Sequence, residues 1–271
     1  MQQTIPPSPT NPPQNPPSLP VPFTASSHAR DNKTHLLLAA SGSVATIKIP
    51  LILHSLSTHS SLSIILLLTK SALTFLSGQS AEQPHYNSLL QIPNVDGVFL
   101  DDEEWVRPWK RGDSILHIEL RRWAHCLVVA PLSANSLAKV VGGLADNLLT
   151  CVVRAWDGSG LLEAGAPPAS LDSGSGTAVG NAGDVGERKK PKRKLIIVAP
   201  AMNTAMWRHP ITTRQIRVLE EEWGVKADGE GEGWFEVLRP MEKELACGDV
   251  GDGAMKDWRE IVRVIEERLE L

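Results

Sequence analysis

Three apolar runs in the sequence each end in a turn of small polar residues, and this recurrence limits the fold more than any other feature. The runs are residues 35–40, 126–130 and 195–199, and Ser, Gly, Pro, Ala and Asn follow them. Short apolar runs bounded by turn residues predict buried strands. Strands that are apolar on both faces are typical of a parallel sheet covered by helices on both sides.

Helical patterns alternate with these runs. Residues 62–69 predict a further buried strand, residues 44–57 and 133–150 predict helices, residues 70–77 predict the start of one, and residues 257–271 form an amphipathic charged helix. Strands alternating with helices indicate a doubly wound, Rossmann-like α/β fold with a parallel sheet. Ligands of such folds bind at the carboxyl ends of the strands.

Two segments depart from this pattern. Residues 1–33 are rich in proline, and about residues 158–193 are rich in Gly, Ala and Ser and end in a run of Lys and Arg. We predict a disordered tail, a disordered insertion, and a single α/β domain over residues 34–271. The basic run is interpreted as solvated charge, with a nuclear-import signal or an anion-binding patch as alternatives.

Composition excludes several classes of protein. The 271 residues are 42% hydrophobic with a formal net charge of -4, so no basic face for nucleic acid is indicated. No apolar stretch is long enough to cross a membrane, and prolines lie where a signal peptide would be apolar, which predicts a cytoplasmic protein. The three cysteines show no CxxC spacing, so neither a disulfide framework nor a metal site is expected.

The turn after the first strand has the composition of a phosphate-binding site. Gly42 allows close approach of the backbone, Ser43 can cap the following helix, and unpaired amides there attract an anion. Alone the signal is weak because the GxGxxG spacing is absent. The turns at residues 130–137 and 199–207 follow two further strands, so all three are expected to converge on one edge of the sheet.

A fourth polar segment, residues 246–255, is rich in glycine and contains Cys247. We predict a mobile flap whose thiol is exposed enough to exchange a proton. Asp249 and Asp252 would suit a calcium loop, but the terminal Glu of an EF-hand is missing, so a metal is not expected.

Seven pieces of the sequence together resemble one family, the homo-oligomeric flavin-containing cysteine decarboxylases, which include the phosphopantothenoylcysteine decarboxylases and the halotolerance flavoproteins. They are Gly-Ser-Val-Ala at 42–45, Thr-Lys-Ser at 69–71, Leu-His-Ile-Glu-Leu-Arg-Arg-Trp at 116–123, Pro-Leu-Ser-Ala-Asn at 131–135, Gly-Leu-Ala-Asp-Asn-Leu-Leu-Thr at 143–150, Pro-Ala-Met-Asn at 200–203 and Ala-Cys-Gly-Asp at 246–249.

The resemblance implies FMN as cofactor and a homotrimer, or a heterotrimer with paralogues, whose active sites lie between subunits. The residues implied to hold FMN are Gly42, Ser43, Val44, Thr69, Lys70, Ser71, Ser133, Ala134, Asn135, Ser136 and Ala201.

The reaction implied is FMN-dependent decarboxylation of 4′-phosphopantothenoylcysteine to 4′-phosphopantetheine, a step of coenzyme A biosynthesis. The flavin takes a hydride from the substrate and later returns it, so no net oxidation occurs. His117 suits the base, because an imidazole titrates near working pH; a capping or core role is its alternative. Asn203 can hold the substrate carboxylate through neutral hydrogen bonds or cap a helix, and Cys247 can return a proton.

Two further residues are expected at the substrate. Arg122 can pair with a substrate phosphate or carboxylate, with a surface salt bridge as the equal alternative. Met206 can contact the substrate or belong to the core.

The sequence departs from the family at His125, where an acidic residue is common, and in the insertion. Two functional alternatives stay open. One is a halotolerance-type regulatory subunit that inhibits a Ser/Thr phosphatase, although the long acidic C-terminal tail of those regulators is absent here. The other is a peptide-cysteine decarboxylase.

Overall fold

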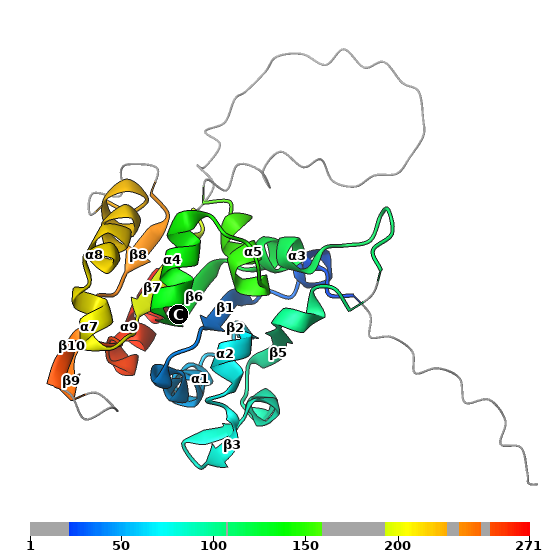
Figure 1. Ribbon diagram of the computed structural model, residues 1–271. Coiled ribbons are helices and arrows are strands. Elements are labelled where there is room, and N and C mark those ends of the chain that lie inside the picture. Colours follow the sequence, from blue (N-terminus) through cyan, green and yellow to red (C-terminus); the bar gives the residue numbers. More distant parts are fainter. Residues whose placement is uncertain (1–21, 107, 159–192, 227–232, 245–249) are drawn as a thin grey trace, which may run out of the picture.

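A six-stranded parallel sheet forms the centre of the protein (Figure 1). The computed structural model describes residues 22–106, 108–158, 193–226, 233–244 and 250–271. The strands lie in the order β5-β2-β1-β6-β7-β8, and every neighbouring pair is parallel. The predicted doubly wound sheet is therefore confirmed. Their bounds are β1 Thr34–Ala40, β2 Leu62–Leu68, β5 Val95–Leu100, β6 Cys126–Leu132, β7 Leu195–Pro200 and β8 Phe235–Val237.

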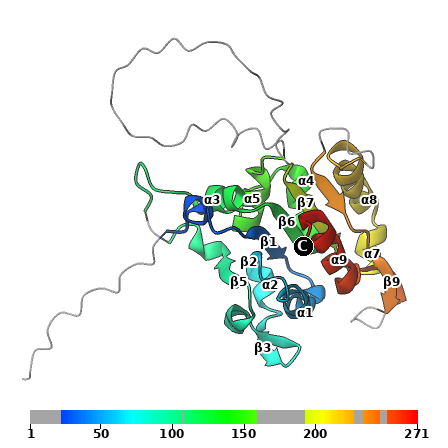
Figure 2. The same ribbon diagram turned by 180° about the vertical axis from the view of Figure 1, so that it is seen from behind.

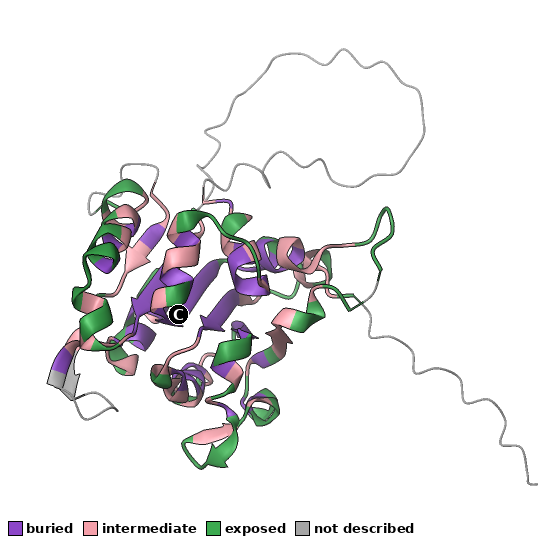
Figure 3. Cartoon of the chain, viewed as in Figure 1, coloured by how far each residue is buried: buried purple, intermediate pink, exposed green. Residues whose placement is uncertain are grey.

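The core lies on both faces of this sheet. All residues of β2 and β6 are buried, as their continuous apolar sequences predict. Successive side chains of a strand point to opposite faces, so Leu36 and Leu38 join one apolar cluster while Leu37 and Ala39 join the other. Figure 3 shows the buried strands in the middle of the molecule, with exposed residues gathered on the outer helices.

Helices cover each face of the sheet. Helices α1 (Ile49–Leu56) and α9 (Trp258–Leu269) bury their apolar sides in the first cluster, and Figure 2 shows α9 from the side on which it lies. The other face is covered by α3 (Leu116–Trp123), α4 (Ala134–Gly142), α5 (Leu148–Arg154) and α8 (Pro210–Arg217). Both faces are thus closed, as a parallel sheet requires.

Three predicted helices differ in detail. The first begins as a 3-10 helix, η2 (Val44–Lys48), and continues as α1. The helix expected over residues 133–150 is two helices, because Gly143 adopts a left-handed φ of 72° that ends α4. Asn147 and Thr150 then form a capping box that starts α5. The helix start predicted at Lys70 is short, α2 (Lys70–Leu73).

Smaller elements join the strands and were not predicted. After α2 come β3 (Ser77–Ser80), β4 (Gln83–His85) and η3 (Tyr86–Gln91), and η4 (Asp101–Glu103) follows β5. After β7 come α7 (Thr204–Arg208), α8 and the π-helix η5 (Val218–Glu222). An antiparallel hairpin of β9 (Met241–Glu244) and β10 (Val250–Ala254) lies against α7.

The N-terminal segment is folded from Phe23 onward. A 3-10 helix, η1 (Ala25–His28), packs on α3, and the Phe23 ring lies edge-on to Phe99 and Trp123. The Ala25 amide donates a hydrogen bond of 2.8 Å to Glu119 Oε2. Part of the stretch predicted as tail therefore belongs to the domain. The rest of that tail, residues 1–21, and nearly all of the predicted insertion lie outside the described residues.

Candidate functional site

The sheet has a topological switch point between β1 and β6. From β1 the chain runs outward through β2 to β5, then returns to β6 and continues in the other direction to β7 and β8. In such a sheet the turns after the two central strands separate and leave a crevice for a ligand. The polar turns singled out from the sequence follow these strands.

Ser41 ties the first two turns together. Its side chain is fully buried, and its Oγ donates to the Pro131 carbonyl at 3.0 Å and accepts from the Ser133 amide at 2.8 Å. The Ser41 amide also donates to the Pro131 carbonyl at 3.0 Å. The starts of the two loops are therefore fixed relative to each other.

A third turn, after β2, packs against the first. A Cβ placed on Gly42 would lie 2.5 Å from Ser71 Oγ and 2.6 Å from Ser71 Cβ, so only glycine allows this approach. The Thr69 amide donates to the Ala40 carbonyl at 3.2 Å, and the Thr69 and Ser71 hydroxyls lie 3.2 Å apart. Close backbone approach at Gly42 thus joins two turns of the protein.

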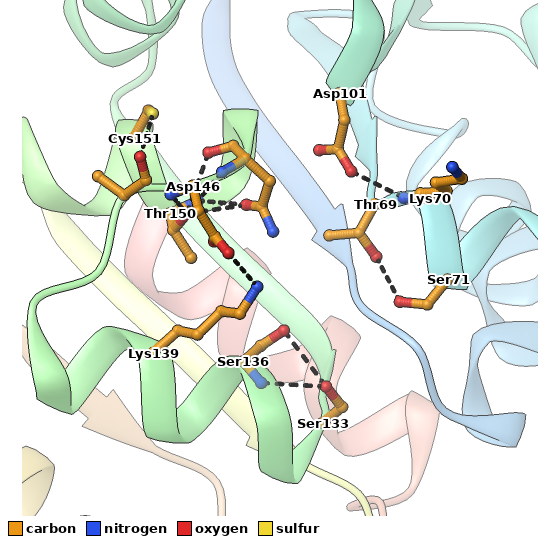
Figure 4. A network of polar contacts seen from close by, with 12 residues as sticks. Thr69, Lys70, Ser71, Asp101, Ser133, Ser136, Lys139, Asp146, Thr150 and Cys151 are labelled. Carbon is orange, nitrogen blue, oxygen red and sulfur yellow. Dashed lines mark hydrogen bonds and ion pairs between the residues drawn. The ribbon is translucent and has the colours of Figure 1, made fainter.

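Further side chains continue this polar network (Figure 4). The Ser133 hydroxyl accepts from the Ser136 amide at 3.3 Å and donates to the Ser136 hydroxyl at 3.2 Å. Lys139 Nζ donates to Asp146 Oδ2 at 2.6 Å, and this hydrogen bond lowers the pKa of the exposed Asp146 carboxyl. Helices α4 and α5 are thereby linked beside the turn after β6.

Asp101 links the end of β5 to the turn after β2. Its Oδ2 accepts from the Lys70 amide at 2.8 Å, as Figure 4 shows. Burial raises the pKa of the Asp101 carboxyl, although the hydrogen bond from Lys70 opposes that shift. The backbone amide of Lys70, a residue predicted to hold the cofactor, is thus already paired within the chain.

The turn after β7 lies next to the turn after β6, because the Ala201 amide donates to the Leu132 carbonyl at 3.0 Å. Asn203 caps α7: its Oδ1 accepts from the Met206 amide at 2.8 Å. The capping alternative for Asn203 is therefore present, and the NH2 end of its exposed side chain is a donor that suits a carboxylate. Met206 is 46% exposed, so it is not a core residue.

These turns offer hydrogen-bond donors for a phosphate, with apolar surface beside them. Ser43 precedes η2 and makes no side-chain cap bond, which leaves its hydroxyl for a ligand. Amides at the start of a helix favour an anion, and Val44, 47% exposed, adds apolar surface beside them. The predicted cofactor residues all follow β1, β2, β6 or β7 at one edge of the sheet: Gly42, Ser43, Val44, Thr69, Lys70, Ser71, Ser133, Ala134, Asn135, Ser136 and Ala201.

His117 lies in the first turn of α3 and is neither its N-cap, which is Ile115, nor fully buried. Its Nδ1 lies 2.8 Å from Glu104 Oε1. The side chains of His117 and Glu104 are 20% and 2% exposed. A partly accessible imidazole held by a buried carboxylate has the arrangement of a general base with its orienting group.

The structure does not bring all predicted residues together. Within the described part of the chain, no hydrogen bond joins His117 to Asn203, and Figures 1 and 2 show α3 and α7 toward opposite sides of the molecule. Arg122 Nη1 donates to Glu119 Oε1 at 2.9 Å, so the salt bridge considered for it is present. Cys247 and the segment 245–249 lie outside the described residues.

Sequence reasoning missed Ser41 as a link between turns, and it missed Asp101, Glu104 and Lys139. A signal for the acids existed, since the run Asp-Asp-Glu-Glu at 101–104 directly follows the apolar run that forms β5. Polar residues at the carboxyl end of a strand are the same pattern from which the other turns were predicted to bind a ligand. The strand itself had not been predicted, so its end could not be located.

Comparison with known proteins identifies the family. A model of the flavoprotein family matches residues 24–270. The chain belongs to this family. It is 40% identical over 225 residues to a probable phosphopantothenoylcysteine decarboxylase of Arabidopsis thaliana. The aligned region covers 83% of each chain. The mouse phosphopantothenoylcysteine decarboxylase is 34% identical, covering 90% of this chain and 92% of that protein.

A solved structure extends the likeness to three dimensions. The structure is that of a cysteine-to-serine mutant of PPC (phosphopantothenoylcysteine) decarboxylase complexed with pantothenoylaminoethenethiol. It is 36% identical to this chain and has a TM-score of 0.61, and the match covers 88% of this chain and all of that one. The family resemblance inferred from the sequence pieces is thus confirmed, and so is its α/β fold.

Neither a membrane span nor a metal site is found in the part of the chain that the structure describes. No helix there has the length and apolar character needed to cross a membrane. The same residues contain no group of three or more His, Cys, Asp or Glu side chains that could hold a metal ion.

Proposed function

We propose that this chain is an FMN-dependent decarboxylase that converts 4′-phosphopantothenoylcysteine to 4′-phosphopantetheine in coenzyme A biosynthesis. The observation that carries the proposal is the joining of the turns after β1, β2, β6 and β7 at one edge of the sheet. These turns contain four of the seven pieces that resemble the family, at residues 42–45, 69–71, 131–135 and 200–203. The similarity to phosphopantothenoylcysteine decarboxylases over most of the chain supports the choice of substrate.

The turns give each part of the cofactor a suitable neighbour. We assign the phosphate of FMN to the hydroxyls and amides around Ser43 and Ser133, and the flavin ring to the apolar surface near Val44 and Ala201. FMN, when bound, supplies a reversible acceptor for a hydride.

The chain's own residues then handle protons and orientation. His117 removes the proton from the substrate thiol, and the Asn203 side-chain amide holds the carboxylate without a countercharge, so that CO2 leaves readily. Met206 and Arg122 border the substrate, and Cys247 returns a proton in the last step. To reach the substrate, Arg122 would have to leave its ion pair with Glu119.

We also propose that the active protein is a homotrimer, or a mixed trimer with related chains, in the cytoplasm. Separation of α3 and α7 in one chain supports sites made between subunits, with His117 from one chain and Asn203 from the next. In a closed ring of subunits with such head-to-tail contacts, the same site is repeated at each interface.

The test is incubation of the purified FMN-loaded protein with 4′-phosphopantothenoylcysteine, followed by mass spectrometry. Formation of 4′-phosphopantetheine supports the proposal. A peptide ending in cysteine, assayed in parallel, identifies a peptide-cysteine decarboxylase if it reacts instead. A yellow protein that decarboxylates neither substrate but inhibits a Ser/Thr phosphatase would instead be a regulatory subunit.

A further inference from the structure

Glu104 presents a buried carboxylate to His117. Its side chain is 2% exposed, and its Oε1 lies 2.8 Å from His117 Nδ1. Its other oxygen, Oε2, is buried and has no hydrogen-bond partner among the described residues. Burying a carboxylate costs free energy unless its hydrogen bonds compensate, so this placement is not that of a surface charge.

The contact decides which nitrogen of His117 carries a proton. An ionised carboxylate can only accept a hydrogen bond, so Nδ1 must donate. In a neutral imidazole the proton on Nδ1 leaves a lone pair on Nε2. His117 can remove a proton from a substrate only through such a lone pair.

The segment that carries Glu104 is held where it leaves β5. The Leu100 amide donates to Glu103 Oε2 at 3.1 Å, and Asp101 Oδ2 accepts from the Lys70 amide at 2.8 Å. The 3-10 helix η4, which Glu104 directly follows, also lies against α5. One short segment therefore contacts both a turn assigned to the cofactor and the residue assigned as the base.

Two other acids, Asp101 and Asp146, lie near Glu104. Burial raises the pKa of the Cys151 thiol most, and the charges of all three acids raise it further. Asp101 and Asp146 are already bonded to Lys70 and Lys139. Glu104, in contrast, is hydrogen-bonded to His117.

We propose that Glu104 is a positioning residue that holds His117 in the Nδ1-protonated tautomer and aims Nε2 at the substrate. The inference rests on the proposed function for the role of His117 as base. The tautomer itself does not depend on which substrate the protein uses.

Glu104→Gln tests the inference with little change in shape. The glutamine NH2 group can donate to Nδ1, which would move the proton to Nε2 and remove the lone pair. Glu103→Gln is the matched control, because it makes the same substitution one residue away, and its amide oxygen can still accept from Leu100. The first readout is the side-chain 15N spectrum of histidine-labelled protein, with the His117 signals assigned by their loss in His117→Asn.

We expect wild type and Glu103→Gln to show the Nδ1-protonated form of His117, and Glu104→Gln to show mainly the other tautomer. In turnover with 4′-phosphopantothenoylcysteine, Glu104→Gln should lower kcat by at least about 10-fold, with KM changed far less. The double variant Glu104→Gln/His117→Asn should be no slower than His117→Asn alone, because the two residues act as one unit.

The outcomes separate the two proposals. An active wild type whose His117 tautomer and kcat are unchanged by Glu104→Gln overturns the inference and leaves the proposed function standing. A wild type that makes no product, but whose His117 changes tautomer in Glu104→Gln only, supports the positioning contact and removes the proposed function. Equal decreases of kcat in Glu103→Gln and Glu104→Gln would mean that both substitutions act by disturbing the fold of the segment. That result would also overturn the inference.

Discussion

Ser41 Oγ accepts a hydrogen bond from the Ser133 amide at 2.8 Å, so the turns after β1 and β6 are joined by one buried hydroxyl. These two strands flank the switch point of the sheet. The shape of the crevice where the cofactor is expected therefore depends on a residue that need not touch the cofactor.

Ser41→Ala should destabilise the protein and weaken FMN binding. It removes the bonds of Ser41 Oγ to Ser133 and Pro131, and the Ser133 amide loses its acceptor, at a cost of about 1–3 kcal/mol in the free energy of unfolding. We expect an FMN Kd raised roughly 10-fold, equivalent to about 1.4 kcal/mol. Urea unfolding and flavin fluorescence measure the two effects.

Ser88→Ala is the control for this change. Ser88 Oγ, in the exposed first turn of η3, donates to the His85 carbonyl at the end of β4, and loss of that bond should change stability by less than about 0.5 kcal/mol. Equal effects of the two substitutions would show that Ser41 has no special part in joining the turns.

Gly42→Ala should force the turns after β1 and β2 apart, because the added methyl group would overlap Ser71. We expect a lower unfolding temperature and a higher FMN Kd. Ser71→Gly removes both atoms that would be overlapped, so the double variant should regain unfolding temperature even if FMN affinity stays low. A double variant no more stable than Gly42→Ala would place the strain elsewhere.

The main sheet was predictable from sequence because its strands are continuous apolar runs. In β1, β2, β6 and β7 nearly every residue is buried, so sequence and structure agree. Strand β5 (Val95–Leu100) has only one residue classed as buried and includes Asp96 and Gly97. Its pattern is typical of an edge, and that strand was missed together with the acids that follow it.

The positions of the polar turns could be predicted because each follows a recognisable strand. The contacts between the turns could not, since Ser41 and Ser133 are far apart in sequence and only the order of the strands makes them neighbours. The break at Gly143 shows a different limit. A helical pattern of apolar residues continues through the break, and the left-handed φ of one glycine decides where the helix ends.

Cys126 should make the protein less stable at alkaline pH. Burial raises the pKa of the Cys126 thiol from 9.0 to about 12. The unfolded chain therefore loses this proton first, so the contribution to stability is complete below pH 9 and is lost as pH rises toward 12. The loss from one such group is at most about 1.4 kcal/mol per pH unit.

Cys126→Ala should remove this part of the decrease in unfolding free energy above pH 9. The cavity that the substitution leaves should lower stability at every pH. The measurement is the difference in unfolding free energy between wild type and Cys126→Ala from pH 7 upward. A difference that stays constant above pH 9 would contradict the raised pKa.

Mixed trimers test whether each site takes His117 and Asn203 from different chains. His117→Asn and Asn203→Ala should each be inactive alone. After the two are unfolded and refolded together in equal amounts, about a quarter of the sites should combine two intact residues, and activity should return to about that fraction of wild type. Tandem affinity tags isolate the mixed species. No recovery in a confirmed mixed trimer would place both residues of a site in one chain.

The most direct test of the proposed function is single-turnover mass spectrometry of the FMN-loaded protein with 4′-phosphopantothenoylcysteine, compared with its His117→Asn variant. We predict that wild type releases CO2 and yields 4′-phosphopantetheine. The His117→Asn variant should retain FMN and leave the substrate intact. Unchanged substrate in the presence of FMN-loaded wild-type protein would contradict the proposed function, and so would equal product from the variant.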